Sequence, residues 1–235
     1  MSNPIVLNIK GIEIHGLQWG NKNGPNLLML HGWLDNAASF SHLAPLLDHY
    51  NVIAVDLPGH GLSGHWPDFS HYHLWAGVED IEWILDALGW SQCHLVAHSM
   101  GAAMGTLYAG TFPQRLSSLT LIEAIGPTAG AVDQAPQRLA VAITKMKNHD
   151  SGQKSKPSLD GFVSARLQGL LKLKEDSALL ISQRSVTESA AGFAWSNDKR
   201  LMNISMMSLP EPLICSFISA ITCPVLGIFA TDGFR

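Results

Sequence analysis

The stretch HLVAHSMGAAM (residues 94–104) reads as an apolar strand, a serine between small residues and the start of a helix. A strand that turns sharply into a helix at Ser99 forces that residue into a strained backbone conformation, which small neighbours such as Ala97 and Gly101 permit. Such a turn holds a hydroxyl above the sheet edge, near backbone N–H groups that can stabilise an oxyanion. A serine that merely caps a helix is the alternative reading; the flanking pattern favours a nucleophile.

Other short, continuous apolar runs alternate with helical patterns around this stretch. The runs lie at 27–31, 52–56, 119–123 and 223–230, and the helical patterns at 40–47, 74–88 and 102–112. Continuous runs are typical of strands that are covered on both faces of a parallel sheet. Segments 5–9 and 12–19 instead alternate about Gly11, as an antiparallel opening pair would. We therefore predict an α/β fold with a mostly parallel, doubly wound sheet, whose site lies at the carboxyl ends of the strands.

The pattern changes after Gly126–Pro127, where only helices are expected until strand character resumes at Cys223. These helices are predicted at 136–147, 159–172, 176–186 and 212–221, with a loop-like stretch at 148–158. A helical block between two strands of one sheet is typical of a cap over the strand ends. The expected organisation is a core at 1–126, a helical cap at 127–210 and a return to the core at 211–235.

Composition narrows the functional classes. The chain is 46% hydrophobic and 14% charged, which indicates a globular protein. No basic run is dense enough for nucleic acid, and Pro224 divides the uncharged stretch 212–231, which argues against a membrane span. Three cysteines without metal-type spacing and no secretion signal indicate reduced thiols in the cytoplasm. No metal or nucleotide motif is present, so no cofactor is expected; the oligomeric state stays open.

Three motifs, in order, resemble those of the α/β-hydrolase superfamily over nearly the whole chain. The serine motif at 97–101 has Ala97 where the family pattern Gly-x-Ser-x-Gly has its first glycine. His-Gly-Trp at 31–33 and Asp-Leu-Pro-Gly-His-Gly-Leu-Ser at 56–63 follow the third and fourth predicted strands. FAWSNDKRL (193–201), with the strand CPVLGIF after it, resembles the serine hydrolase-like branch.

The resemblance assigns the oxyanion hole to the backbone N–H groups of Trp33 and Met100. Gly32 permits the tight turn that aims the first of these amides inward. His31 is interpreted as a structural histidine that pins the loop, and Asp56 as a residue that bonds nearby backbone. The Trp33 side chain is a candidate wall of the acyl pocket, which would favour small or flat substrates.

Two carboxylates are candidates for the acid of a catalytic triad. Asp232 follows the last predicted strand, where most family members keep the acid, although its spacing from Pro224 is one residue short of the usual pattern. Glu123 ends the run LTLIE and resembles an arrangement found in one class of haloalkane dehalogenases. Glu123 is slightly favoured. A strand-end carboxylate that packs against the cap is its alternative role, and dehalogenation itself is not implied, because those enzymes need Asp where this chain has Ser99.

The base histidine of the triad is not found in the expected place. In this fold the base follows the last strand, yet the last histidine is His149, in a polar loop. His98 adjoins Ser99 but, on a strand, points to the opposite face, so we interpret it as structural. Relative to the family, the sequence lacks a final strand and helix, roughly 40–50 residues at average lengths. The expectation is a core that is incomplete at its carboxyl end, with the histidine outside the given sequence. A naturally shortened gene product that has lost its base is the alternative.

The predicted function is hydrolysis of a small carboxylic ester, a small-molecule substrate, through an acyl-enzyme on Ser99. Little activity is expected from these 235 residues without the base. A catalytically silent binding protein, or a carbon–carbon bond hydrolase or lyase, could use the same fold. A fluorophosphonate probe would separate these classes: the first would not react and the second would react weakly.

Overall fold

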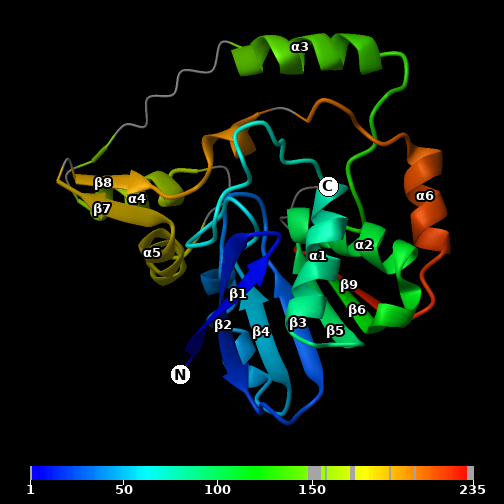
Figure 1. The fold of residues 1–235 in the computed structure, drawn as a ribbon, viewed down its shortest axis with the longest axis horizontal. Coiled ribbons are helices and arrows are strands. Elements are labelled where there is room, and N and C mark those ends of the chain that lie inside the picture. The colour runs from blue at the N-terminus through cyan, green and yellow to red at the C-terminus, as the bar shows by residue number, and fades with distance from the viewer. Residues whose placement is uncertain are drawn as a thin grey trace.

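A seven-stranded sheet forms the centre of the molecule, in the order β1-β2-β4-β3-β5-β6-β9 (Figure 1). The computed structural model describes residues 2–147, 155–156, 158–169, 173–190, 192–203 and 205–231. The strands of this sheet are β1 (Asn3–Ile9), β2 (Ile12–Gly20), β3 (Asn26–Leu30), β4 (Asn51–Val55), β5 (Cys93–His98), β6 (Leu116–Ile122) and β9 (Val225–Ile228). Strands β1 and β2 pair antiparallel, as does β2 with β4, and the remaining pairs are parallel. The predicted α/β class is confirmed.

Alternate residues of the central strands pack into two different apolar clusters. In β3, Leu28 and Leu30 join the cluster that contains buried residues of helices α1 and α2, whereas Leu27 and Met29 join a cluster with Phe40. The covering elements are α1 (Ala76–Ala87), α2 (Met100–Thr111) and the 3-10 helices η1 (Ala37–Phe40) and η2 (Ala44–Leu46). Both faces of the central strands are therefore covered, which explains why these parallel strands are continuous apolar runs.

The helix predicted at 40–47 is wrong in type, because this stretch contains parts of η1 and all of η2. Asn36 begins η1 by accepting a hydrogen bond from the N–H of Ala38. Pro45 lies inside η2 and has no N–H to donate to a longer helix. Short 3-10 turns therefore cover this face of the sheet where an α-helix was expected.

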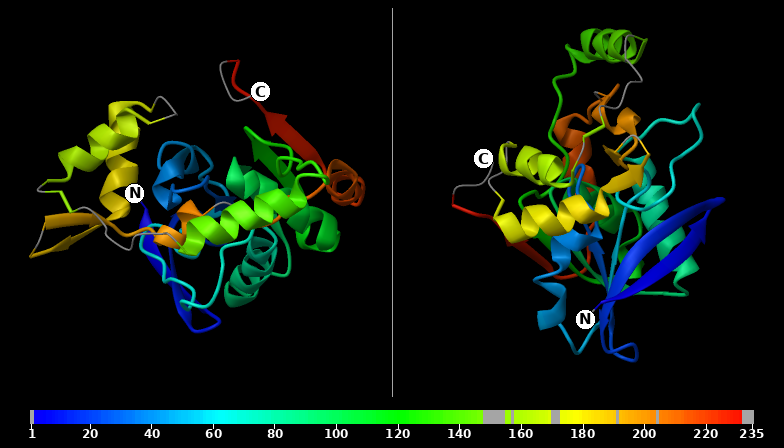
Figure 2. Two further views of the ribbon diagram at one scale, coloured as in Figure 1. Left: turned by 90° about the horizontal axis from the view of Figure 1, so that it is seen from above. Right: turned by 90° about the vertical axis from the view of Figure 1, so that its left-hand side faces the viewer.

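The stretch 127–210, which we call the insertion, lies between β6 and the helix α6 (Glu211–Ser219). Its elements are α3 (Ala135–Lys147), α4 (Asp160–Leu167), α5 (Glu175–Arg184), β7 (Val186–Ser189), β8 (Gly192–Trp195) and the 3-10 helix η4 (Lys199–Met202). In Figure 1, α4, α5 and the β7–β8 hairpin form a group on one side of the molecule, while α6 lies on the other side beside α2. Figure 2 shows α3 extended across the molecule in the view from above.

The prediction that this stretch is purely helical is wrong at the β7–β8 hairpin. The two strands pair antiparallel from Val186↔Trp195 to Ser189↔Gly192. Valine, threonine and aromatic residues fit a pleated surface better than a helix, and Gly192 takes a φ of 102°, which few other residues adopt. The hairpin is stabilised by the Trp195 ring, which lies edge-on to Phe162 at 4.7 Å between centroids.

The last strand, β9, pairs in parallel with β6 at the edge of the sheet. Its residues are all exposed, and Leu226 and Phe229 each retain more than half of their accessible surface. Across the residues that the structure describes, no helix combines the length and apolar character that a membrane crossing requires.

Candidate functional site

The turn between β5 and α2 is strained at Ser99. Ser99 has φ 50° and ψ −112°, outside the regions that an L-residue usually occupies. Its N–H donates to the carbonyl of Ile122 on β6 at 2.8 Å, which fixes the turn to the neighbouring strand. A Cβ on Gly101 would lie 2.6 Å from the carbonyl oxygen of Leu30, closer than real contacts allow. The turn therefore requires glycine at 101 and presents Ser99, half-buried, at the strand ends.

The loop after β3 packs directly on this turn. A Cβ on Gly32 would lie 3.4 Å from the Cβ of Ser99 and 3.0 Å from Nδ1 of His98, so the two backbones approach closely. Met100 is the first residue of α2, and its N–H therefore has no acceptor within the helix. Trp33 and Met100 both line a cavity beside the turn. The two residues predicted to supply oxyanion donors thus line the same cavity, and Ser99 is not itself among its lining residues.

The His31 side chain fixes the loop after β3 through two hydrogen bonds. Its side chain is fully buried, with Nδ1 2.7 Å from the carbonyl oxygen of Gly32 and Nε2 2.9 Å from the N–H of Leu57. Since a carbonyl only accepts and an N–H only donates, Nδ1 carries the proton and Nε2 is the acceptor. Burial lowers the pKa of His31 to about 4. The ring is therefore neutral near pH 7 and joins the loops after β3 and β4.

Asp56, at the end of β4, joins the same edge to the insertion. Its buried carboxylate accepts hydrogen bonds from the N–H groups of Ala37 at 2.8 Å and Leu62 at 2.9 Å. It also accepts from Nε of Arg184, the last residue of α5, at 2.9 Å. The carboxylate thus bonds backbone, as the sequence indicates, and in addition holds an arginine of the insertion that the sequence does not predict.

A second arginine of the insertion binds the loop after β3. Arg166 of α4 forms an ion pair with Asp35 at 2.9 Å and also donates to the carbonyl of Leu34. Burial raises the pKa of Asp35, and the positive charge of Arg166 opposes this rise. The indole Nε1 of Trp33 donates to the carbonyl of Leu201 in η4 at 2.9 Å. The insertion is therefore attached to the residues immediately beyond the His-Gly-Trp motif.

The two acid candidates differ in what the structure describes. Glu123 follows β6 with φ 63°, and its carboxylate accepts a hydrogen bond from the N–H of Ala230, just beyond β9. Ile122, the residue before Glu123, pairs with His98 on β5, the residue before Ser99. Glu123 and Ser99 are therefore the next residues of two neighbouring strands. Asp232 lies outside the described residues, as does His149.

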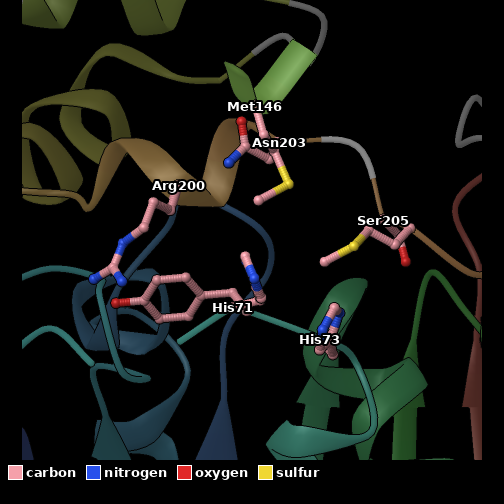
Figure 3. Close-up of a pocket in the computed structure, with 8 residues that line it drawn as sticks. His71, His73, Met146, Arg200, Asn203 and Ser205 are labelled. Atoms are coloured by element: carbon pink, nitrogen blue, oxygen red, sulfur yellow. The ribbon is translucent and has the colours of Figure 1, made fainter. Parts of the chain in front are cut away.

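The cavity beside the turn has a volume of about 190 Å³. Its walls come from the loops after β3 and β4, the amino end of α1, the start of α2 and η4 of the insertion. They include Trp33, Leu57, His60, Trp66, Leu74, Asp80, Met100, Met104 and Leu201. A smaller pocket adjoins it and shares His71 and His73; Figure 3 shows these side chains below Arg200 and Asn203 of the insertion. The cavity is mostly apolar and extends beneath the insertion.

Two polar side chains of this cavity were not singled out in the sequence. His60 is 2% exposed; its Nδ1 lies 3.0 Å from the carbonyl oxygen of Pro58, and its Nε2 has no hydrogen-bond partner among the described residues. Asp80 is 6% exposed and lies in the first half of α1. The sequence gives no signal that sets Asp80 apart, because Glu79 and Glu82 are acidic residues of the same stretch.

Known proteins that are similar to this chain have the same kind of fold. A family model described as alpha/beta hydrolase fold matches residues 25–143. The chain is 33% identical to serine hydrolase-like protein 2 of Homo sapiens over 92% of its own length and 71% of that protein. It is 29% identical to a serine hydrolase-like protein of Danio rerio, over 94% of this chain and 69% of the relative.

A solved structure shares the arrangement of almost all the described elements. The crystal structure of a hypothetical protein of Pseudomonas aeruginosa PAO1 superposes with a TM-score of 0.93 at 33% identity, covering 97% of this chain and 82% of that one. Together with the serine hydrolase-like relatives, this family supports hydrolase activity. The chain belongs to the alpha/beta hydrolase fold family, in its serine hydrolase-like branch.

Proposed function

We propose that Ser99 is the nucleophile of a serine hydrolase that cleaves a small carboxylic ester. One observation carries the proposal: the backbone at Ser99 is strained, with φ 50° and ψ −112°, at the end of β5 and directly against the Gly32 loop. Strain in a residue that is not glycine persists only where the surrounding structure imposes it, and it is concentrated at active sites. A serine that only capped a helix would need no such conformation, and Ser99 makes no side-chain capping bond to α2.

In the proposed reaction, Ser99 Oγ attacks the ester carbonyl and transfers its proton to a histidine base. The carbonyl oxygen becomes an oxyanion, which accepts hydrogen bonds from the N–H groups of Trp33 and Met100. The C–O bond then breaks, the base returns the proton to the leaving alcohol, and an acyl-enzyme remains on Ser99. A water molecule, deprotonated by the same base, then attacks the acyl carbon. The bond to Ser99 Oγ breaks, the base returns the proton to Oγ, and the carboxylic acid is released.

The proposal assigns the base to neither His31 nor His98. His31 is occupied by two structural hydrogen bonds, to Gly32 and Leu57. His98 packs against Gly32, where its Nδ1 lies 3.0 Å from the position of an added Cβ. Glu123 is the preferred acid because it lies one ladder step from Ser99 and its carboxylate reaches the chain beyond β9. Asp232 remains the alternative acid.

The insertion is proposed to act as a cap. It contributes Leu201 and Asn203 to the cavity beside Ser99, and it is tied to the strand ends through Asp35 and Asp56. A cover of this kind excludes water from the acyl-enzyme and restricts the substrate to what fits beneath it.

The test is formation of the acyl-enzyme, which needs only one attack on an activated ester. The chain is incubated with p-nitrophenyl acetate, with imidazole added as an external base, and acetylated peptides are identified by mass spectrometry. We expect acetyl on Ser99 in the unmodified chain and none at this position in Ser99→Ala. The exposed Ser91, replaced by Ala, serves as a matched control that should leave the adduct unchanged.

Acetyl groups spread over surface lysines, with none on Ser99 in a folded chain, would contradict the proposal. The same result would favour a binding protein that keeps the fold without the chemistry. Circular dichroism of each variant establishes that the fold is intact.

A further inference from the structure

Asp80 is a buried carboxyl group in the wall of an otherwise largely apolar cavity. It retains 6% of its accessible surface and lines the 190 Å³ space together with Met100, the residue after the proposed nucleophile. By the same measure a single water needs roughly 10–15 Å³, so the cavity has room for a chain of several carbon atoms. Most of its other walls are apolar or aromatic: Trp33, Leu57, Trp66, Leu74, Ala76, Gly77, Met104 and Leu201.

Among the described residues, no cation forms an ion pair with Asp80. Lys10, the nearest cation, binds Glu79 instead, with 2.6 Å between Nζ and Oε1. Burial raises the pKa of Asp80 to about 7; Lys10 and the Trp66 side chain oppose this rise, and the charge of Glu79 adds to it. Near neutral pH a large fraction of Asp80 is therefore the uncharged acid, which can both donate and accept a hydrogen bond.

A buried polar group facing apolar surroundings costs free energy unless a partner satisfies it. The Trp66 side chain donates one hydrogen bond to Asp80, and a carboxyl group can make more than one. In the same cavity, Nδ1–H of His60 donates to Pro58 and leaves Nε2 as an acceptor without a partner among the described residues. An apolar cavity that also carries polar side chains is typical of a pocket that binds an apolar ligand with a small number of polar atoms; the other polar side chains here are His71, Tyr72, His73, Asn203 and Ser205.

We propose that Asp80 is a specificity-determining residue that binds a hydroxyl group on an aliphatic substrate lying in this cavity. The inference rests on the proposed function, because it takes the cavity beside Ser99 as the place where the substrate binds. It narrows the substrate class to hydroxylated aliphatic esters. A hydroxyl accepts a hydrogen bond from the acid form of Asp80 and can donate to the carboxylate form.

A neutral hydroxyl fits this cavity better than an ammonium group does. An ammonium ligand requires Asp80 to be ionised, and burial of that carboxyl among Leu74, Met104 and Trp66 favours the uncharged form. A site built to bond a hydroxyl also discriminates against the analogue that lacks it, since the buried polar group is then left without a partner.

The test separates binding from catalysis by using Ser99→Ala as the background for every protein. Isothermal titration calorimetry compares 6-hydroxyhexanamide with hexanamide, two probes that differ only in the terminal hydroxyl. With Asp80 present, we expect the hydroxylated probe to bind about tenfold more tightly. Asp80→Leu should abolish this preference, and Asp80→Asn, which keeps a donor and an acceptor in the same volume, should keep most of it.

Glu79→Gln is the matched control on the same turn of α1. It removes one neighbouring negative charge, but its side chain is 60% exposed and pairs with Lys10, so the tenfold preference should persist. Equal binding of the two probes with Asp80 intact, or no binding of either, overturns the inference. So does an unchanged preference in a folded Asp80→Leu variant. If that variant does not fold, Asp80→Ala replaces it, and an unchanged preference in that variant overturns the inference in the same way.

Failure of the inference and failure of the proposed function give different results. A hydroxyl preference that depends on Asp80, without any acetyl adduct on Ser99, shows that the ligand site exists and that the proposed chemistry does not. An adduct on Ser99 without a hydroxyl preference shows the reverse.

Discussion

The strand ends and the insertion are held in place by different kinds of interaction. The strand ends belong to a parallel ladder with apolar clusters on both faces, in which Leu28, Leu30 and Val55 are completely buried. The insertion is tied to that edge by polar contacts: Arg166 with Asp35, and Arg184 with Asp56. Apolar packing in a sheet is distributed over many residues, whereas each ion pair depends on two side chains. The comparison indicates a rigid base and an insertion that a few substitutions can loosen.

Gly101→Val is expected to destabilise the strand ends more than any other substitution proposed here. The new side chain would begin 2.6 Å from the carbonyl oxygen of Leu30 and 2.7 Å from that of His31, both backbone atoms that cannot move aside. We expect the free energy of unfolding to fall by about 4 kcal/mol, together with loss of the Ser99 adduct. Urea denaturation measures the first effect.

Gly105→Ala is the matched control for that change, one turn further along α2. Its new Cβ would meet side-chain carbons of Leu95 at 3.2 Å and Ala97 at 3.4 Å, and alanine favours the helix. Its stability should stay within about 1 kcal/mol of the unmodified chain. A loss as large as that of Gly101→Val would show that the close approach of Gly101 to the strand ends is not what matters.

Arg184→Met tests the more deeply buried tie of the insertion. Removing the guanidinium leaves the fully buried Asp56 with its two backbone donors and no positive partner. Because an uncompensated buried charge is costly, we expect a loss of about 3 kcal/mol in the free energy of unfolding. The exposed Lys145, changed to Met, removes one positive charge from solvent and should change stability little.

Arg166→Met should have a smaller and more local effect. Its partner Asp35 keeps 13% of its side-chain surface exposed, so water can hydrate the carboxylate once the pair is broken. We expect a loss of about 1–2 kcal/mol and faster amide hydrogen exchange in α4 and α5, with exchange in α2 unchanged. Equally accelerated exchange in α2 would contradict the division between a rigid base and a loosely attached insertion.

Asp80 is also expected to give the rigid side a stability that depends on pH. Since the pKa of Asp80 is raised from 3.8 to about 7, the folded chain binds its proton more tightly than the unfolded chain does. Stability therefore falls as pH rises between about 4 and 7 and is level above, with a slope of at most about 1.4 kcal/mol per pH unit.

The difference in stability between Asp80→Asn and the unmodified chain isolates this contribution. His31 and His60 have lowered pKa values, about 4 and about 3, and act in the opposite direction between those values and 6.5, but they are present in both proteins. Relative to the unmodified chain, Asp80→Asn should gain stability from pH 4 to 7. A flat difference across this range would contradict a raised pKa at Asp80.

The rigid side could be predicted from the sequence because its signals are local. The runs at 27–31, 52–56 and 94–98 lie within one residue of β3, β4 and β5, and the turn at Ser99 is marked by its small neighbours. The β7–β8 hairpin was missed because its strands have four residues each, too few to show a clear alternation.

The contacts between the insertion and the strand ends could not be predicted in the same way. Arg184 and Asp56 are 128 residues apart, and Arg166 and Asp35 are 131 apart, so no periodicity links them. Asp80 and His60 meet in one cavity only because α1 and the loop after β4 converge. Spacing identifies residues that act through the backbone of one turn, and it does not identify pairs that the tertiary fold assembles.

Trp33 belongs to both regions, since its main chain follows the Gly32 loop and its indole is bonded to Leu201 of η4. Displacement of η4 therefore pulls on the same residue whose amide is proposed to face the reacting carbonyl. An inhibitor of this protein need not resemble a substrate or reach the serine. A small molecule that displaces the Trp33 indole from the Leu201 carbonyl would misalign that amide without binding at the serine, and would slow turnover.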